Sequence, residues 1–157
     1  MSTAVLFAAT ACTAQTIPKE IWGQWTVRRE LPTKAISCWG EPEAKRLIGS
    51  ELEYSDKLFR WNTVITDHPI ASIRTVTAEQ FQSENSSPSV NGSQVSFHQL
   101  GIVAKQAEEI SIHHEPANIT KATVEIPGDS VLVKNSNTII FSVCNVYFEA
   151  KRVRDNT

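Results

Sequence analysis

The sequence predicts an all-β protein, a small antiparallel up-and-down β-barrel of about eight strands with one or two short helices. Apolar and polar residues alternate along most segments after residue 14, which is typical of strands with one buried face. Residues that favour turns separate these segments, and closure into a barrel would remove the unpaired strand edges. With 157 residues, 41% of them hydrophobic, the chain can build one core, so we expect a single domain over residues 15–157.

Residues 1–14, MSTAVLFAATACTA, carry no charge and consist largely of small and apolar residues. They resemble the apolar core and cleavage region of a secretory signal, with cleavage after Ala11 or Ala14. A frayed N-terminal strand and lipid attachment at Cys12 are the alternatives. The run is shorter than the roughly twenty apolar residues that a membrane span needs. We therefore expect a secreted or periplasmic protein without a membrane span.

Removal of the signal would leave Cys38 and Cys144 as an even pair of cysteines. In an oxidising compartment such a pair is expected to form a disulfide. Two buried free thiols are the alternative.

The first half of the domain predicts three strands. Residues 21–28 alternate, with Trp25 on the apolar face, and residues 51–54 alternate in the same way. Ser55-Asp56-Lys57 is typical of a turn and would join that second strand to a third in a hairpin. The third strand is expected to continue without a break through Phe59, Trp61, Thr63 and Ile65.

The second half predicts further strands and two short helices. Pro42 and Gly49 bracket one helix, and Thr77 with Gln80 has the spacing of a capping box for the other. Residues 82–93, QSENSSPSVNGS, are polar and are expected to form a loop. A turn or bulge is expected at Cys144-Asn145. The strand candidates are residues 71–76, 94–97, 109–113, 123–126, 130–134, 138–143 and 146–153.

Two residues far apart in the sequence are expected to close the barrel. Trp25 points inward, and Arg152 shares its parity with Val146, Phe148 and Ala150, so a cation–π stack on Trp25 would give this arginine a partner. Gly23-x-Trp25 followed by Arg152 near the other terminus resembles the lipocalin and wider calycin superfamily. In that family the Trp and Arg stack at the barrel base, which implies structural roles for Gly23, Trp25 and Arg152. The alternative is another β-sandwich, with Trp25 in its core and Arg152 exposed.

The sequence carries no motif for catalysis or for a cofactor. It has no Gly-x-Ser-x-Gly elbow and no glycine-rich phosphate loop, so we expect no enzyme, no catalytic residue and no cofactor. His113 and His114 would point to opposite faces of a strand, and His68 and His98 have no partner at ligand spacing, so no metal site is expected. The 15 basic and 17 acidic residues form no basic block, which argues against a nucleic-acid partner.

The remaining functional signal is a set of aromatic residues assigned to the inward parity. They would line a pocket for a small apolar ligand in the barrel lumen, or simply fill it. We therefore expect a secreted or periplasmic lipocalin-like binding protein and a monomer. The alternative is a protein-binding module, an inhibitor of or immunity protein against a cell-envelope hydrolase, acting through residues 82–93 or the loop around Trp39. The expected ligand-contacting residues are Tyr54, Phe59, Trp61, Phe97 and Phe141.

Overall fold

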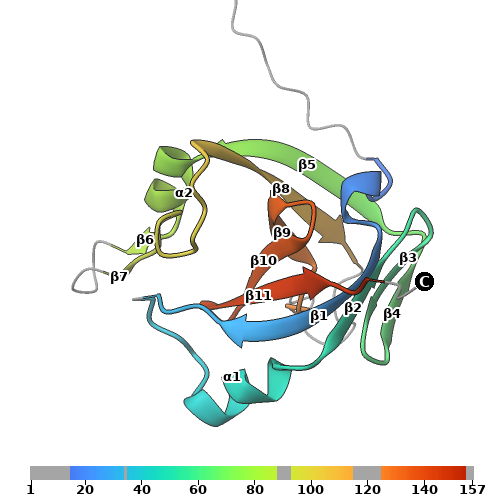
Figure 1. Ribbon diagram of the computed structural model, residues 1–157, viewed down its shortest axis with the longest axis horizontal. Coiled ribbons are helices and arrows are strands. Elements are labelled where there is room, and N and C mark those ends of the chain that lie inside the picture. Colours follow the sequence, from blue (N-terminus) through green and yellow to red (C-terminus); the bar gives the residue numbers. More distant parts are fainter. Residues whose placement is uncertain (1–14, 34, 88–92, 115–124, 155–157) are drawn as a thin grey trace, which may run out of the picture.

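One strongly curled antiparallel sheet forms the body of the protein in the computed structural model, which describes residues 15–33, 35–87, 93–114 and 125–154 (Figure 1). In chain order the elements of these ranges are η1 (Lys19–Ile21), β1 (Gly23–Glu30), α1 (Glu41–Leu47), β2 (Glu51–Tyr54), β3 (Leu58–Trp61), β4 (Val64–Asp67), β5 (Ile70–Thr77), α2 (Ala78–Glu84), β6 (Ser86–Ser87), β7 (Ser93–Gln94), β8 (Gln106–His113), β9 (Ser130–Asn135), β10 (Thr138–Val143) and β11 (Val146–Arg152). The signal-like residues 1–14, with Cys12 and both cleavage positions, lie outside the described residues, as do 88–92 and the first half of the strand candidate 123–126, whose residues 125 and 126 are not in a strand.

The nine strands of the main sheet follow the order β4-β3-β2-β1-β11-β10-β9-β8-β5. Strands of this sheet that follow one another along the chain are neighbours, except β4 and β5, which form its two edges. The sheet is therefore a meander. The prediction that the first and last strands lie side by side is confirmed, because β1 pairs with β11 and Trp25 lies opposite Arg152. The all-β, antiparallel fold class is confirmed as well.

The sheet differs from the expected closed barrel of about eight strands. Within the described ranges it is a half-barrel, and its edge strands β4 and β5 are not hydrogen-bonded to each other. The additional strand arises because the run from Phe59 to Ile65 is not one strand. Asn62 has a left-handed backbone with φ of 49°, so Asn62 and Thr63 turn the chain between β3 and β4.

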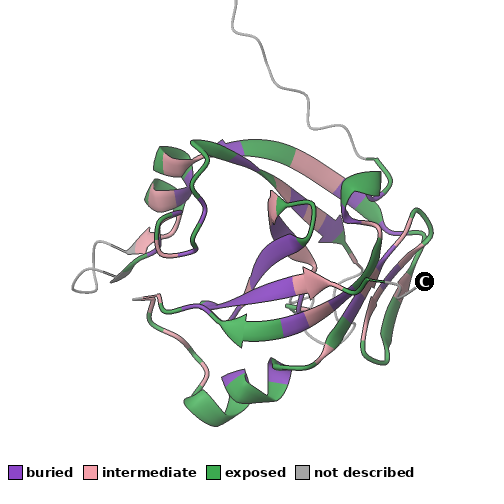
Figure 2. Ribbon diagram, viewed as in Figure 1, coloured by how far each residue is buried: buried purple, intermediate pink, exposed green. Residues whose placement is uncertain are grey.

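Buried residues recur along the strands of the sheet (Figure 2), and their side chains form two clusters, one on each face. On β9, β10 and β11, consecutive residues belong to different clusters because side chains alternate between the faces. The inner cluster contains Trp25, Ile139 and Phe148, and the outer cluster contains Ile140 and Tyr147. The segment from α2 to Ile102 supplies much of the outer cluster, including Phe81, Val95, Phe97 and Leu100.

The predicted helices and the predicted turn are present. Thr77 and Gln80 form the capping box of α2, and Pro42 lies in the first turn of α1. Cys144 and Asn145, both with positive φ, join β10 to β11 in a two-residue turn. The described part of the expected loop 82–93 differs, since it contains the end of α2 and the paired strands β6 and β7. None of the described helices is long and apolar enough to cross a membrane.

The disulfide between Cys38 and Cys144 is confirmed. It attaches the segment between β1 and α1 to the β10–β11 turn. Two hydrogen bonds accompany it, from the Cys38 N–H to the Cys144 carbonyl at 3.3 Å and from Asn145 Nδ2 to the Ile36 carbonyl at 3.0 Å. The loop that carries Trp39 is therefore held against the sheet.

Candidate functional site

Trp25 and Arg152 form a stack at one end of the half-barrel. The guanidinium carbon lies 4.2 Å from the centroid of the Trp25 ring, and Trp25 is fully buried. The indole N–H donates to the Ile21 carbonyl at 2.8 Å. Arg152 also donates to the carbonyls of Glu20 and Trp22, so its guanidinium holds the end of η1 over the sheet. With Nε donating to the Ser136 carbonyl, each of the three guanidinium nitrogens donates to a backbone carbonyl.

Gly23 lies beside the guanidinium of Arg152, two residues before Trp25, and has a backbone conformation that favours glycine. Its φ is +116°, and a Cβ at this position would lie 3.2 Å from Nη1 of Arg152. The strand can therefore pass close beneath the guanidinium only without a side chain here.

Three of the five expected ligand-contacting aromatics are packed inside the sheet. Tyr54 stacks on Phe59 with ring centroids 5.3 Å apart, and Phe141 stacks on Phe148 at 5.5 Å. Burial raises the pKa of Tyr54 well above its usual value of 10, so its hydroxyl stays protonated and donates to the Gly128 carbonyl at 2.8 Å. These rings meet one another and the surrounding core.

Trp61 and Phe97 lie apart from those three residues. Phe97 belongs to the outer cluster, where its ring centroid is 5.2 Å from that of Phe81, so it is not an inward-facing residue. Trp61 is partly buried and packs against the inner cluster. Its indole Nε1 is buried and has no hydrogen-bond acceptor among the described residues. The structure thus does not gather the five aromatics around one cavity.

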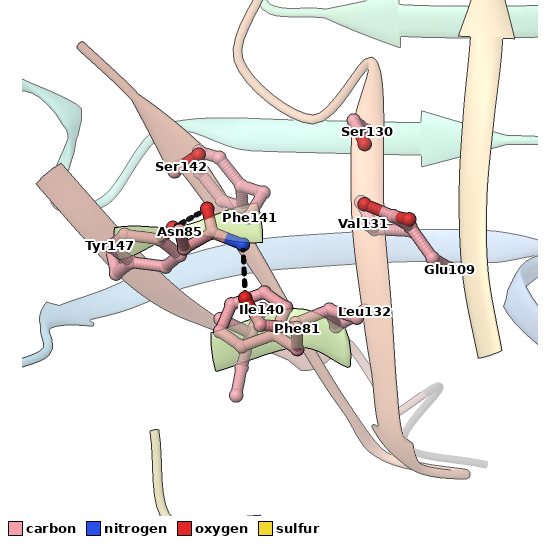
Figure 3. Close-up of a pocket in the computed structure, with 10 residues that line it drawn as sticks. All are labelled: Phe81, Asn85, Glu109, Ser130, Val131, Leu132, Ile140, Phe141, Ser142 and Tyr147. Atoms are coloured by element: carbon pink, nitrogen blue, oxygen red, sulfur yellow. Dashed lines mark hydrogen bonds between the residues drawn. The ribbon is translucent and has the colours of Figure 1, made fainter. Parts of the chain in front are cut away.

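A small cavity of about 60 Å³ lies between α2 and the outer face of the sheet (Figure 3). Its polar groups already have partners within the protein. Tyr147 donates to Asn85 Oδ1 at 2.9 Å, Asn85 Nδ2 donates to the Phe81 carbonyl at 2.8 Å, and Glu109 pairs with Arg74. Burial raises the pKa of Tyr147 to about 12, which keeps this donor protonated. The cavity is too small for an organic ligand, since ligand pockets usually exceed about 300 Å³.

Two larger cavities lie at the connection between β4 and β5. Their volumes are about 310 and 230 Å³, and His68, Pro69 and Ile70 line both of them. The accessible surface of the first cavity is mostly apolar, and that of the second is about equally polar and apolar. Both cavities are partly open to solvent, whereas a small-molecule pocket buries most of the surface of its ligand. The first cavity is completed by Gln15, Thr16 and Asp56, and the second by Thr66, Asp67, His113 and His114.

Two of the histidines that line the second cavity have hydrogen-bond partners. His114 Nε2 lies 3.0 Å from Asp129 Oδ2, and His113 Nε2 lies 3.2 Å from the Ser72 hydroxyl. No group of three or more His, Cys, Asp or Glu side chains in the described ranges is arranged to hold a metal ion.

The free edge of β4 is the exposed apolar feature of the same region. Val64 and Ile65 of β4 are 39% and 57% exposed, and Ile70 at the start of β5 is 53% exposed. Ile65 was expected on the inward face of a longer strand, and that expectation is wrong because the turn at Asn62 starts a new edge strand in which Ile65 pairs with Arg60 and shares its face, while Val64 and Thr66 share the face of Trp61 and Phe59. The hairpin β3–β4 lies at the margin of the molecule (Figure 1). Sequence reasoning missed this edge, although Asn at a two-residue turn is a recognisable hairpin signal.

The loop around Trp39 does not offer a free aromatic anchor. Trp39 is partly buried and packs against the inner cluster. Ser37 Oγ fixes the local backbone, since it accepts from the Trp39 N–H at 2.9 Å and donates to the Trp39 carbonyl at 3.0 Å. With Cys38 in a disulfide, this loop is a structural connection.

The comparisons with known proteins identify no family. No protein-family model matches the chain, and no curated protein or solved structure matches it significantly. The function must therefore be argued from the residues of this chain alone.

Proposed function

We propose that the chain is a protein-binding module without catalytic activity, which binds an extended segment of a protein by strand addition to the free edge of β4. The observation that carries the proposal is this edge, where exposed Val64 and Ile65 lie in a strand that, within the described ranges, pairs on one side only. An unpaired edge presents a row of N–H and C=O groups that another strand can satisfy. The place of docking thus differs from residues 82–93 and the Trp39 loop, which were the candidates for the protein-binding alternative.

The ladder with β3 decides which backbone groups are available. The His68 N–H donates to the Lys57 carbonyl at 2.8 Å, and the register pairs Thr66 with Phe59 and Val64 with Trp61. Alternate residues of an antiparallel strand direct their backbone groups to opposite sides. Val64, Thr66 and His68 therefore bond towards β3, while Ile65 and Asp67 direct their N–H and C=O groups outward.

The opposite edge of the sheet is less open. On β5 the outward groups of Ala71 already exchange two hydrogen bonds with Gln15, at 3.0 and 2.6 Å. The β4 edge has no such partner within the described residues. We therefore assign the docking edge to β4.

A second candidate function is the binding of a small apolar ligand inside the half-barrel. The observation that favours it is the buried Trp61 Nε1, a donor without an acceptor in the described part of the chain. Buried donors are normally satisfied, so a ligand carbonyl that entered beside β3 could accept from it. Native mass spectrometry of protein purified from its own host would reveal such a ligand as a retained mass.

We also propose that the protein acts in a secreted or periplasmic setting and that its fold is related to the calycin barrels. The disulfide supports the first point, because disulfides persist in oxidising compartments. The Trp25–Arg152 stack and the meander order support the second. Mass spectrometry of the N-terminus of host-derived protein would show whether cleavage follows Ala11 or Ala14.

Strand addition can be tested by NMR with a synthetic peptide of alternating Thr and Val as the probe. We expect the amide signals of Ile65 and Asp67 to shift on titration and to exchange more slowly with deuterium. The same peptide with N-methyl groups along one edge should not bind. Ile65→Pro removes an outward N–H without removing a bond to β3, so it should abolish the shifts. Shifts that spare β4 and cluster around Trp61 would favour the small-ligand alternative instead.

A further inference from the structure

We infer that the segment added to β4 is β4 of a second copy of this chain, so that two half-barrels join edge to edge as a two-fold symmetric dimer. The inference rests on the proposed function and names the partner of the same edge. It departs from the monomer that the sequence led us to expect.

The backbone directions restrict how two copies can pair. Only outward residues can exchange hydrogen bonds across the new ladder, and these are Ile65 and Asp67 of each copy, with Thr63 in the preceding turn. A two-fold antiparallel pairing that overlaps most of β4 has two registers. In one, Ile65 lies opposite Ile65 of the second copy. In the other, Thr66 lies opposite itself, and Ile65 lies opposite Asp67 of the second copy.

The exposed side chains favour the first register. Ile65 is 57% exposed, and pairing it with its own copy removes apolar surface of both chains from water. Val64, 39% exposed, then lies opposite Thr66, and both residues are β-branched. Asp67 lies opposite Thr63, whose hydroxyl can donate to the carboxylate. The second register would instead place the apolar Ile65 side chain against a carboxylate.

The strand is its own complement under this symmetry. Asp67 is the one charged residue of β4, and in the first register it does not meet itself. The Val64–Thr66 and Asp67–Thr63 contacts each occur twice, because a two-fold interface joins the same patch of both chains, and the Ile65–Ile65 contact lies on the axis. The net charge of −2 per chain adds little repulsion between the copies. An unrelated peptide would have to supply this match from its own sequence, whereas a second copy supplies it automatically.

Sedimentation velocity over a range of protein concentrations tests the inference. We expect the wild-type chain to show a concentration-dependent monomer–dimer equilibrium. Ile65→Lys and Ile65→Glu each place like charges opposite each other at the two-fold axis, so each should weaken self-association at least about tenfold. An equimolar mixture of the two variants places Lys opposite Glu and should restore the dimer. Val103→Lys alters a fully exposed apolar residue outside β4 and is the matched control, which should dimerise like the wild type.

The outcomes separate this inference from the proposed function. A wild-type chain that remains monomeric at every concentration overturns the dimer, while the peptide titration still decides whether the β4 edge accepts a strand. A dimer that Ile65→Lys leaves intact, or a mixture of the charge variants that stays monomeric, also overturns it, because either result places the contact in another register or on another face. Circular dichroism of each variant verifies that the fold is retained.

Discussion

Arg152 and Trp25 lie opposite each other in the β1–β11 ladder, and the guanidinium of one covers the indole ring of the other at 4.2 Å. The same guanidinium donates to the Glu20 carbonyl at 2.6 Å, and its Nε donates to the Ser136 carbonyl at 2.8 Å. One side chain therefore connects η1, the β9–β10 turn and the first and last strands. The stack therefore has a structural role, because it holds these elements together, and it is not a binding site.

Removing either member of this pair should destabilise the fold, and the two losses of unfolding free energy should not be additive. Trp25→Ala empties a fully buried position and should cost about 3–5 kcal/mol of unfolding free energy. Arg152→Ala should cost less in the Trp25→Ala background than in the wild type, with a coupling of about 1 kcal/mol. Urea denaturation of the four proteins measures the cycle, and the exposed Arg154→Ala is the control. Strictly additive losses would argue against the stack as an energetic unit.

Gly23→Ala should be more damaging than Gly49→Ala, although both glycines have positive φ. At Gly49, with φ of +88°, no atom lies within 4 Å of the added Cβ, so only backbone strain of about 1–2 kcal/mol is expected. At Gly23 the Cβ also lies 3.2 Å from Arg152 Nη1. The excess cost should disappear in the Arg152→Ala background. Thermal denaturation compares the variants, and an equal loss at both glycines would contradict the close approach.

The sequence could predict the strands whose burial pattern is regular. Trp25, Phe148 and Ala150 have the predicted inward parity, and they belong to the inner cluster because one face of each strand packs on the core. The capping box at Thr77 was also predictable, because it depends only on residues close together in the sequence.

The features that period-two reasoning missed depend on tertiary context. Phe97 has the apolar character of an inward residue, but it packs on the outer face because the segment after α2 folds over the sheet. Ile65 lies an even number of residues after Phe59, so alternation alone places both on one face. The turn that begins at Asn62, whose backbone is left-handed, instead puts Ile65 in the separate edge strand β4. Alternation within a strand cannot show which of two covered faces a residue joins, or where a two-residue turn divides a run.

Loss of the disulfide should lower the stability of a folded protein rather than prevent folding. Cys38 and Cys144 are separated by 106 residues, so the bond restricts the unfolded chain strongly, and its removal should cost about 2–5 kcal/mol. The hydrogen bond from Asn145 to the Ile36 carbonyl would still hold the loop. The melting temperature of the wild type should fall on addition of reductant, while that of the Cys38→Ala/Cys144→Ala variant should be lower and insensitive to reductant. Equal melting temperatures of the wild type with and without reductant would contradict this expectation.

Glu149 is a buried carboxylate surrounded by three cations on the outer face of the sheet. It is 3% exposed, and its oxygens lie 3.3 Å from Arg29 Nε, 3.2 Å from Lys134 Nζ and 3.3 Å from Lys151 Nζ. Burial by itself would raise the pKa of Glu149, but the hydrogen bonds from Arg29 and Lys134 and the charges of Lys134 and Lys151 outweigh it. The pKa of this carboxyl is consequently held below its usual value of 4.5.

Stability should therefore fall in acid through this residue. A carboxyl whose pKa is lower in the folded than in the unfolded protein stabilises the fold above its unfolded pKa. That contribution is lost as the pH falls from about 4.5 through the lower folded pKa. Glu149→Gln should cost about 2 kcal/mol at pH 7, because three cations lose their charged acceptor. The difference between wild type and variant should shrink as acid is added, as measured by urea denaturation from neutral pH to about pH 3. The exposed Glu30→Gln controls for removing a surface carboxylate, and a difference that stays constant with pH would show that Glu149 does not have a lowered pKa.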